Sequence, residues 1–386
     1  MSTAKKIRVL IVDDSAVARE MLERGLSLDP DIAVVGKAAD AYAARDKIVF
    51  LKPDVITLDV EMPRMDGIEF LKRLMPQYPI PTVVVSAVTV EGSRRALEAL
   101  DAGALEVVAK PSAGDRVALK DMLADLVEKV KAAAGADLSK LMKDAKPVSP
   151  ASRLTSTKTG HAAAPASPGG HRTTGSKRLI AIGASTGGTT ALHRVVEALP
   201  ADVPPIVIVQ HMPPVFTRMF AEALNRSSAV QVLEAEDGTP VMPGTVLIAQ
   251  GDLHMRVAKR FGELVVVCDK GPKVSGHRPS VDVLFNSVAD VVGPEAIGVL
   301  LTGMGRDGAD GMVAMARRGA HCLAQDEASS VVWGMPREAW EAGAAEKLVP
   351  LDEMTREILA LLGREDNGGG NSASSATIGK QEATWG

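Results

Sequence analysis

Two sets of reactive side chains stand at the ends of apolar runs in this sequence. Three carboxylates, those of Asp13, Asp14 and Asp59, follow runs rich in Val, Leu and Ile. A serine, Ser185, follows another such run within Gly-Ala-Ser-Thr-Gly-Gly. Clustered carboxylates suit a magnesium ion and a phosphoryl group, whereas a serine on a tight strand-to-helix turn suits acyl transfer. Because one chain holds both, we expect the first chemistry to control the second.

The elements predicted for the N-terminal part would bring these carboxylates together. Short apolar runs, separated by segments of helical periodicity, stand at residues 7–12, 33–36, 54–58, 82–87 and 105–109. Such runs indicate parallel strands buried on both faces, and strands alternating with helices predict a doubly wound α/β domain. In that architecture the site lies at the carboxyl ends of the strands, where Asp13, Asp14 and Asp59 stand.

Two further polar residues end strands of the same predicted sheet. Ser86 ends the fourth run, and Lys110 ends the fifth. The lysine could pair with a phosphoryl oxygen or with the acceptor carboxylate, and the serine could donate a hydrogen bond to the new phosphoryl group. A lone Asp after a strand is more often a cap than a site, but five polar groups at strand ends favour a functional site.

These motifs resemble the receiver domain of two-component response regulators. The resemblance rests on residues 12–15 (Val-Asp-Asp-Ser), 58–67 (Leu-Asp-Val-Glu-Met-Pro-Arg-Met-Asp-Gly), 86 (Ser) and 110–111 (Lys-Pro). It implies a flavodoxin-like fold in which Asp59 is the phosphoacceptor. It also implies a Mg²⁺ ion for phosphorylation, held by Asp13, Asp14, Asp59 and the backbone carbonyl of Glu61.

The sequence departs from the receiver pattern at one position. Many receivers have an aromatic switch residue three positions before the lysine, where this sequence has Val107. A signalling account that depends on an aromatic flip is therefore not supported for this chain.

The second reactive centre belongs to another α/β series, which begins at Arg178. Strand-like runs stand at residues 179–182, 206–210, 230–234, 245–249, 264–268, 296–302 and 321–324. We predict that 245–268 forms a hairpin insertion. Glycines around Ser185 would let the backbone turn sharply and expose the serine beside the N–H groups of a helix. Alone, this pattern is weak, since a glycine-rich strand–helix turn more often binds phosphate or simply turns.

A serine nucleophile needs a base and an acid that orients it. Of seven histidines, only His211 directly ends a long apolar run, so it should reach the carboxyl edge of the sheet. The acid could be Asp307, Asp252 or Asp326, because each stands just beyond an apolar run. Spacing alone does not choose among the three.

The second half of the chain resembles the protein-glutamate methylesterases of bacterial chemotaxis. The resemblance rests on residues 183–188 (Gly-Ala-Ser-Thr-Gly-Gly), 210–214 (Gln-His-Met-Pro-Pro), 277–285 (His-Arg-Pro-Ser-Val-Asp-Val-Leu-Phe), 301–308 (Leu-Thr-Gly-Met-Gly-Arg-Asp-Gly) and 325–328 (Gln-Asp-Glu-Ala). It implies a Rossmann-like esterase with a triad of Ser185, His211 and Asp307 and no cofactor for the ester hydrolysis. Thr186 and Met304 match family positions next to the active site. No chemical role follows for 277–285, which we interpret as a structural or substrate-groove segment.

Composition divides the chain and excludes several classes of protein. Between the two series lies a stretch rich in Pro, Gly, Ser, Thr and Ala, typical of a flexible linker. We predict a receiver domain at 5–134, a linker at 135–177, a methylesterase domain at 178–364 and a disordered tail at 365–386. The net charge of −4 gives no reason to expect nucleic acid as a partner. No window approaches the roughly 18 apolar residues that span a bilayer.

The combined resemblance implies an enzyme that hydrolyses glutamate γ-methyl esters on chemoreceptors when its receiver is phosphorylated, and that also deamidates receptor glutamines. Its partners would be the methyl-accepting receptors and the histidine kinase of the chemotaxis system. The two cysteines, both within apolar stretches, indicate a reduced cytoplasmic protein, which we expect to be a monomer. A binding module that has lost activity is the competing hypothesis, and the complete triad argues against it. A DNA-binding regulator would need a basic recognition helix, which we do not find.

Overall fold

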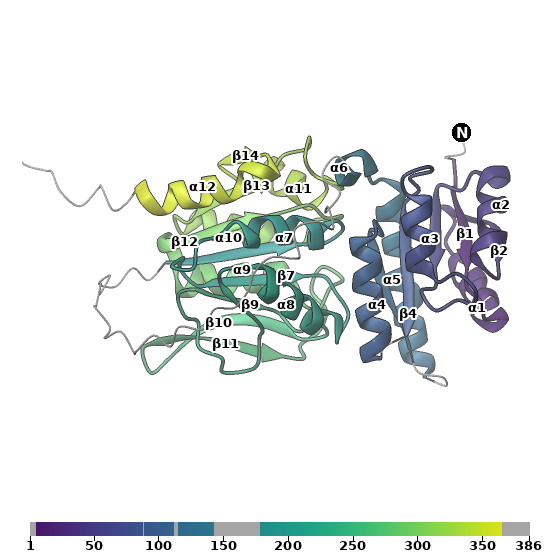
Figure 1. Cartoon of the computed structure of the whole chain (residues 1–386). Helices are drawn as coiled ribbons and strands as arrows, with labels where there is room; N and C mark the ends of the chain where they lie inside the picture. Colours follow the sequence, from purple (N-terminus) through teal and green to yellow (C-terminus); the bar gives the residue numbers. More distant parts are fainter. Residues whose placement is uncertain (1–4, 88, 112–114, 143–177, 365–386) are drawn as a thin grey trace, which may run out of the picture.

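The structure is a computed structural model that describes residues 5–87, 89–111, 115–142 and 178–364. It contains two α/β units side by side (Figure 1). The first unit is a five-stranded sheet of order β2-β1-β3-β4-β5, parallel throughout. Its strands are β1 (Ile7–Val12), β2 (Ile32–Ala38), β3 (Val55–Leu58), β4 (Thr82–Ala87) and β5 (Glu106–Lys110). Its helices are α1 (Ala16–Leu26), α2 (Ala41–Leu51), α3 (Gly67–Leu74), α4 (Val90–Asp101) and α5 (Arg116–Ala134).

The second unit is a seven-stranded parallel sheet of order β14-β13-β12-β6-β7-β9-β8. Its strands are β6 (Leu179–Ala184), β7 (Ile206–Gln210), β8 (Gln231–Glu234), β9 (Thr245–Ile248), β12 (Ala296–Leu300), β13 (His321–Gln325) and β14 (Lys347–Val349). Its helices are α7 (Gly188–Glu197), α8 (Phe216–Ser227), α9 (Val281–Val291), α10 (Ala309–Arg317), α11 (Met335–Glu341) and α12 (Leu351–Arg364), with a short 3₁₀ helix at Gly293–Glu295. The first strand of this unit, β6, lies between β7 and β12, so the strand order reverses at β6.

The predicted fold class, two parallel-sheet α/β units with a hairpin insertion in the second, is confirmed. The hairpin is smaller than predicted: it consists of β10 (His254–Arg260) and β11 (Glu263–Asp269), which pair antiparallel. The run at 245–249 instead forms β9 of the main sheet. The strand cores are buried on both faces, as the apolar runs predicted. Val107 is also buried, in β5 opposite Val84 of β4.

The segment that begins the predicted linker packs on the second unit. Helix α6 (Leu138–Met142) lies there. The Asp137 N–H donates to the Val331 carbonyl at 3.0 Å, and the Lys140 ammonium donates to the Glu327 carbonyl at 2.7 Å. These bonds satisfy backbone carbonyls of the second unit and hold this part of the chain in place. The rest of the predicted linker and the predicted tail lie outside the described residues.

The two units meet through helices α4 and α5 of the first, which lie between the two sheets (Figure 1). Helix α4 packs against α8. Helix α5 lies opposite the carboxyl edge of the seven-stranded sheet, where it shares a cavity with Ser185 and His211. None of the described helices is long and apolar enough to cross a membrane.

Candidate active site and phosphoacceptor site

Ser185 and His211 are brought together by the register of two neighbouring strands. In the parallel pair β6–β7, Ala184 lies opposite Gln210, so the next residue of each strand emerges at the same place. The Ser185 N–H donates to the Thr302 carbonyl beyond β12 at 3.0 Å, which fixes the start of the turn. Gly187 then has φ +75° and lies against Val331, a conformation that only glycine adopts without strain. The turn therefore exposes Ser185 at the point where the strand order reverses.

His211 is oriented by Asp307. The His211 Nε2 atom lies 2.8 Å from Asp307 Oδ2, and both side chains are buried. The other ring nitrogen, Nδ1, has no hydrogen-bond partner in the described part of the chain. With the proton on Nε2 shared with the carboxylate, the Nδ1 lone pair is left to accept a proton, and Ser185 lines the same cavity. Burial, and next the neighbouring His277, lower the pKa of His211, so the ring is neutral in its resting state.

Asp307 is held by the N-terminus of α9. Its carboxylate accepts hydrogen bonds from the Ser280 hydroxyl (2.7 Å), the Val281 N–H (2.8 Å) and the Asp282 N–H (3.1 Å). Burial alone would raise the pKa of Asp307, but the bonds from His211, Ser280 and the backbone outweigh it and hold the pKa well below its usual range. Asp307 is therefore an anion at neutral pH, fixed at the positive end of a helix.

The two other candidate acids, Asp252 and Asp326, bond to groups other than His211. Asp252 pairs with Arg278 (2.9 Å) and with Lys270 (3.0 Å). Asp326 accepts the N–H of Ser329 at 3.0 Å in its own turn. Neither forms a hydrogen bond with His211, so of the three candidate acids it is Asp307 that contacts this histidine.

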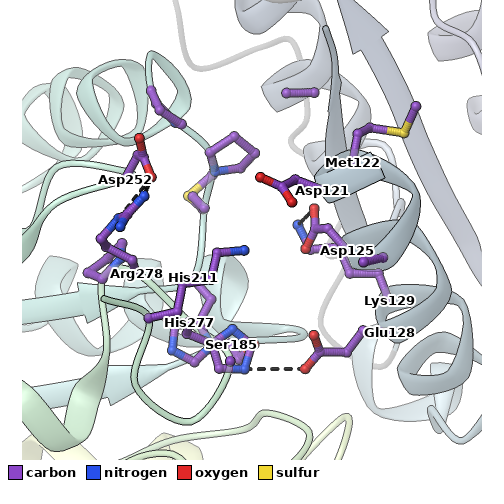
Figure 2. A pocket seen from close by; sticks show the side chains of 18 of the residues that line it. Asp121, Met122, Asp125, Glu128, Lys129, Ser185, His211, Asp252, His277 and Arg278 are labelled. Atoms are coloured by element: carbon purple, nitrogen blue, oxygen red, sulfur yellow. Dashed lines mark hydrogen bonds and ion pairs between the residues drawn. The ribbon is translucent and has the colours of Figure 1, made fainter. Parts of the chain in front are cut away.

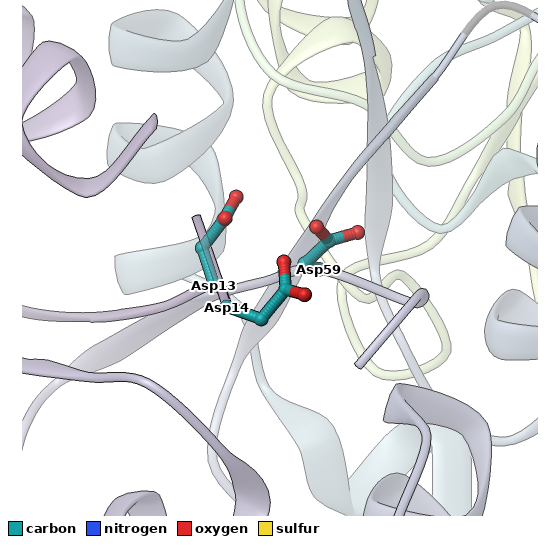
Figure 3. A group of neighbouring side chains, drawn as sticks. All are labelled: Asp13, Asp14 and Asp59. Carbon is teal, nitrogen blue, oxygen red and sulfur yellow. The ribbon is translucent and has the colours of Figure 1, made fainter. Parts of the chain in front are cut away.

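The three predicted carboxylates of the first unit also converge. Ligand oxygens of Asp13, Asp14 and Asp59 lie within 4.8 Å of one another at the ends of β1 and β3 (Figure 3). Lys110 bridges two of them, at 2.8 Å from Asp13 and 2.6 Å from Asp59. The pKa of Asp59 is raised, chiefly because the side chain is buried. The ammonium of Lys110 lowers this pKa, whereas the negative charge of Asp13 raises it. Crowded oxygen ligands with one exposed carboxylate, Asp14, fit a hard cation such as Mg²⁺.

Ser86 and Glu61 lie beside this cluster in arrangements the sequence did not specify. The Ser86 hydroxyl donates to the Gly92 carbonyl in the first turn of α4 at 3.1 Å. The Glu61 N–H donates to Asp59 at 3.1 Å, so Glu61 contacts the predicted phosphoacceptor through its backbone. A metal contact through the Glu61 carbonyl stays a prediction.

Comparisons with known proteins identify the family of each half of the chain. Residues 180–358 match the CheB methylesterase family, and residues 9–123 match the response regulator receiver domain. A protein-glutamate methylesterase/protein-glutamine glutaminase of Syntrophotalea carbinolica is 54% identical over 93% of this chain and 98% of that protein. The chain belongs to the CheB methylesterase family. A second relative with that name, from Anaeromyxobacter dehalogenans, is 52% identical over 93% of this chain and 96% of its own length.

Solved structures of CheB domains are similar to each half separately. The catalytic domain of Thermotoga maritima CheB methylesterase is 38% identical, with a TM-score of 0.47, and covers 48% of this chain and 98% of that one. The response regulator domain of Thermotoga maritima CheB is 41% identical, with a TM-score of 0.32, and covers 34% of this chain and 99% of that one.

Sequence reasoning missed several residues that build the methylesterase site. No chemical role was predicted for the segment 277–285, yet Ser280, Val281 and Asp282 all donate hydrogen bonds to the Asp307 carboxylate. Burial raises the pKa of Asp282, and the neighbouring Asp307 raises it further, while its carboxylate accepts the N–H groups of Gly308 and Gly311. A signal was present, because a serine before apolar residues at helical spacing predicts a helix start.

Proposed function

We propose that this chain is a phosphorylation-activated protein-glutamate methylesterase of the chemotaxis system, which hydrolyses glutamate γ-methyl esters on chemoreceptors and deamidates receptor glutamines. The observation that carries the proposal is the contact of His211 with Asp307 beside Ser185, in a CheB-family chain that also contains a receiver unit. The histidine kinase of that system would supply the phosphoryl group. We place the enzyme in the cytoplasm, as a monomer.

The triad supports ester hydrolysis in two steps. His211 takes the Ser185 proton at Nδ1 while the serine oxygen attacks the ester carbonyl. The imidazolium, stabilised by Asp307, then gives that proton to the departing methoxide, so methanol leaves and an acyl-enzyme remains. Water, deprotonated by His211, attacks the acyl group; the proton returns to the serine oxygen and glutamate is released.

Backbone N–H groups are placed to stabilise the oxyanion of this reaction. The N–H groups of Thr186 and Met304 find no acceptor among the residues that the structure describes, and both residues line the cavity with Ser185. Thr186 lies two residues before the start of α7, next to its N-cap Gly187, where the helix dipole favours negative charge. We propose these two groups as the oxyanion hole.

The first unit restrains the second by covering Ser185. Helix α5 lines one wall of the cavity of about 590 Å³ whose other wall holds Ser185 and His211. A receptor helix, which is about 10 Å wide with its side chains, needs that wall removed to reach the serine. Phosphorylation would therefore act by shifting the balance between docked and released states.

The route from Asp59 to the interface runs through α4. A phosphoryl group on Asp59 adds charge that Lys110 and the Ser86 hydroxyl are placed to bind. Turning toward it, Ser86 would give up its bond to Gly92 in the first turn of α4, the helix that packs on α8. Asp13, Asp14 and Asp59 would hold the Mg²⁺ that neutralises charge during phosphoryl transfer.

Replacing Asp59 with asparagine is expected to abolish stimulation of methanol release by Mg²⁺ and a small phosphodonor, because the acceptor carboxylate is gone. The assay measures methanol from methylated receptor membranes. Asp46→Asn, an exposed acid on α2, is the control and should respond like the parent. Full stimulation of the Asp59 variant would contradict its role as the phosphoacceptor.

A further inference from the structure

Helix α5 sends a glutamate side chain toward the catalytic base. Glu128 Oε1 lies 3.2 Å from Nε2 of His277, a residue of the second unit. The His277 ring in turn stacks on His211, with ring centroids 3.8 Å apart and planes inclined by 13° (Figure 2). Glu128, His277, His211 and Ser185 all line the same cavity. A carboxylate on a receiver helix thus contacts the histidine that stacks directly on His211, the proposed base.

The surroundings of Glu128 on α5 let this side chain protrude. Ala124 lies one helical turn before it and Ala132 one turn after it, and both also line the cavity. Small residues at these positions allow the helix backbone to approach the esterase closely while the glutamate extends into the gap. Helix α5 therefore presents to the active site what the proposed substrate presents after hydrolysis, namely a glutamate side chain on a helix.

We propose that His277 is the subsite for the γ-carboxyl group of the receptor glutamate, and that Glu128 occupies this subsite as an internal product mimic while the receiver is docked. The inference rests on the proposed function. In addition to the steric covering of Ser185 by the receiver, Glu128 would compete directly with the substrate for the subsite beside Ser185. Release of the receiver then frees His277 to bind the substrate and also opens a path to Ser185.

The charges at this contact favour a carboxylate over a neutral ester. The hydrogen bond from His277 lowers the pKa of Glu128 below its usual range. Burial alone would lower the pKa of His277, but Glu128, and then Asp307 and Asp125, raise it. A charged glutamate, the form of the product, is therefore held more firmly than its uncharged methyl ester. Such a subsite is suited to an inhibitory occupant such as Glu128, because a neutral ester substrate can bind there only after the receiver has undocked.

The first test compares Glu128→Gln with Glu69→Gln in the full chain. Glu69 is a matched control, since it also lies on a receiver helix, pairs with Arg73 and has the same 47% exposed side chain as Glu128. Without phosphodonor, Glu128→Gln should raise methanol release by about fivefold, the factor expected for a half-exposed ion pair. Glu69→Gln should match the parent. Equal rates for the two variants would overturn the proposal.

The second test separates product mimicry from a simple tether. A helical receptor peptide with one unmethylated glutamate, and the same peptide with alanine there, are added to the Glu128→Gln chain with phosphodonor. The glutamate peptide should inhibit methanol release competitively and about tenfold more strongly, because only it can bond to His277. His277→Gln on the same background should remove this difference. Equal inhibition by the two peptides would overturn the subsite.

These outcomes are distinct from failure of the proposed function. If the parent releases no methanol with phosphodonor, the enzyme assignment fails. If the parent is stimulated but Glu128→Gln behaves like Glu69→Gln, the enzyme assignment stands and the product mimic fails.

Discussion

Replacing Ser185 with alanine is expected to abolish methanol release from methylated receptors, with a loss on the order of 10⁶ in kcat as in other serine triads. The substitution removes the hydroxyl oxygen that we propose attacks the ester, while the turn is kept by backbone bonds of Ser185 to Thr302 and Gly188. The assay compares the phosphorylated variant and parent, and circular dichroism checks that both are folded.

Ser227→Ala is a suitable control for this experiment, because Ser227 is exposed at the end of α8 and does not line the cavity that contains Ser185. It should retain the parental rate with phosphodonor. If Ser185→Ala kept activity within about tenfold of the parent, a loss of only about 1.4 kcal/mol, Ser185 would not be the nucleophile. An inactive binding module, the competing hypothesis, would show no methanol release even from the parent.

The main sheets were predictable because their strands are buried on both faces. Continuous apolar runs such as Ile206–Gln210 predict a buried strand wherever they lie in the chain. Elements at the periphery were missed for the opposite reason. In β10 (His254–Arg260) four of the seven residues are polar or charged, and β14 (Lys347–Val349) is only three residues long. Short or mixed segments depend on their neighbours, which a local pattern does not contain.

The site was predictable where it depends on strand ends and unpredictable where it depends on packing. Ser185 and His211 follow directly from two adjacent parallel strands. Asp307 does not, since Asp252 and Asp326 follow apolar runs equally well. What distinguishes Asp307 is the N-terminus of α9, more than twenty residues earlier, which supplies three donors to its carboxylate. The Glu128–His277 contact joins two units, so no sequence spacing encodes it.

Substituting the other two members of the triad is expected to separate proton transfer from orientation. His211→Gln should be nearly as inactive as Ser185→Ala, because the base that takes the serine proton is lost. Asp307→Asn should retain more activity, with a loss on the order of 10⁴ in kcat. Both are measured as methanol release by the phosphorylated chain. Asp252→Asn and Asp326→Asn are the matched acidic controls and should lose far less.

The geometry explains why Asp307→Asn is damaging although it does not transfer a proton. An asparagine amide would place its NH₂ group either against His211 Nε2 and the Val281 N–H, or against the Ser280 hydroxyl and the Asp282 N–H. With NH₂ toward His211, the ring must accept at Nε2 and carry its proton on Nδ1, the tautomer that cannot deprotonate Ser185. With NH₂ toward Ser280, it faces the Asp282 N–H, so a donor meets a donor in a buried site. Should Asp252→Asn or Asp326→Asn prove the more damaging change, the orienting acid would not be Asp307.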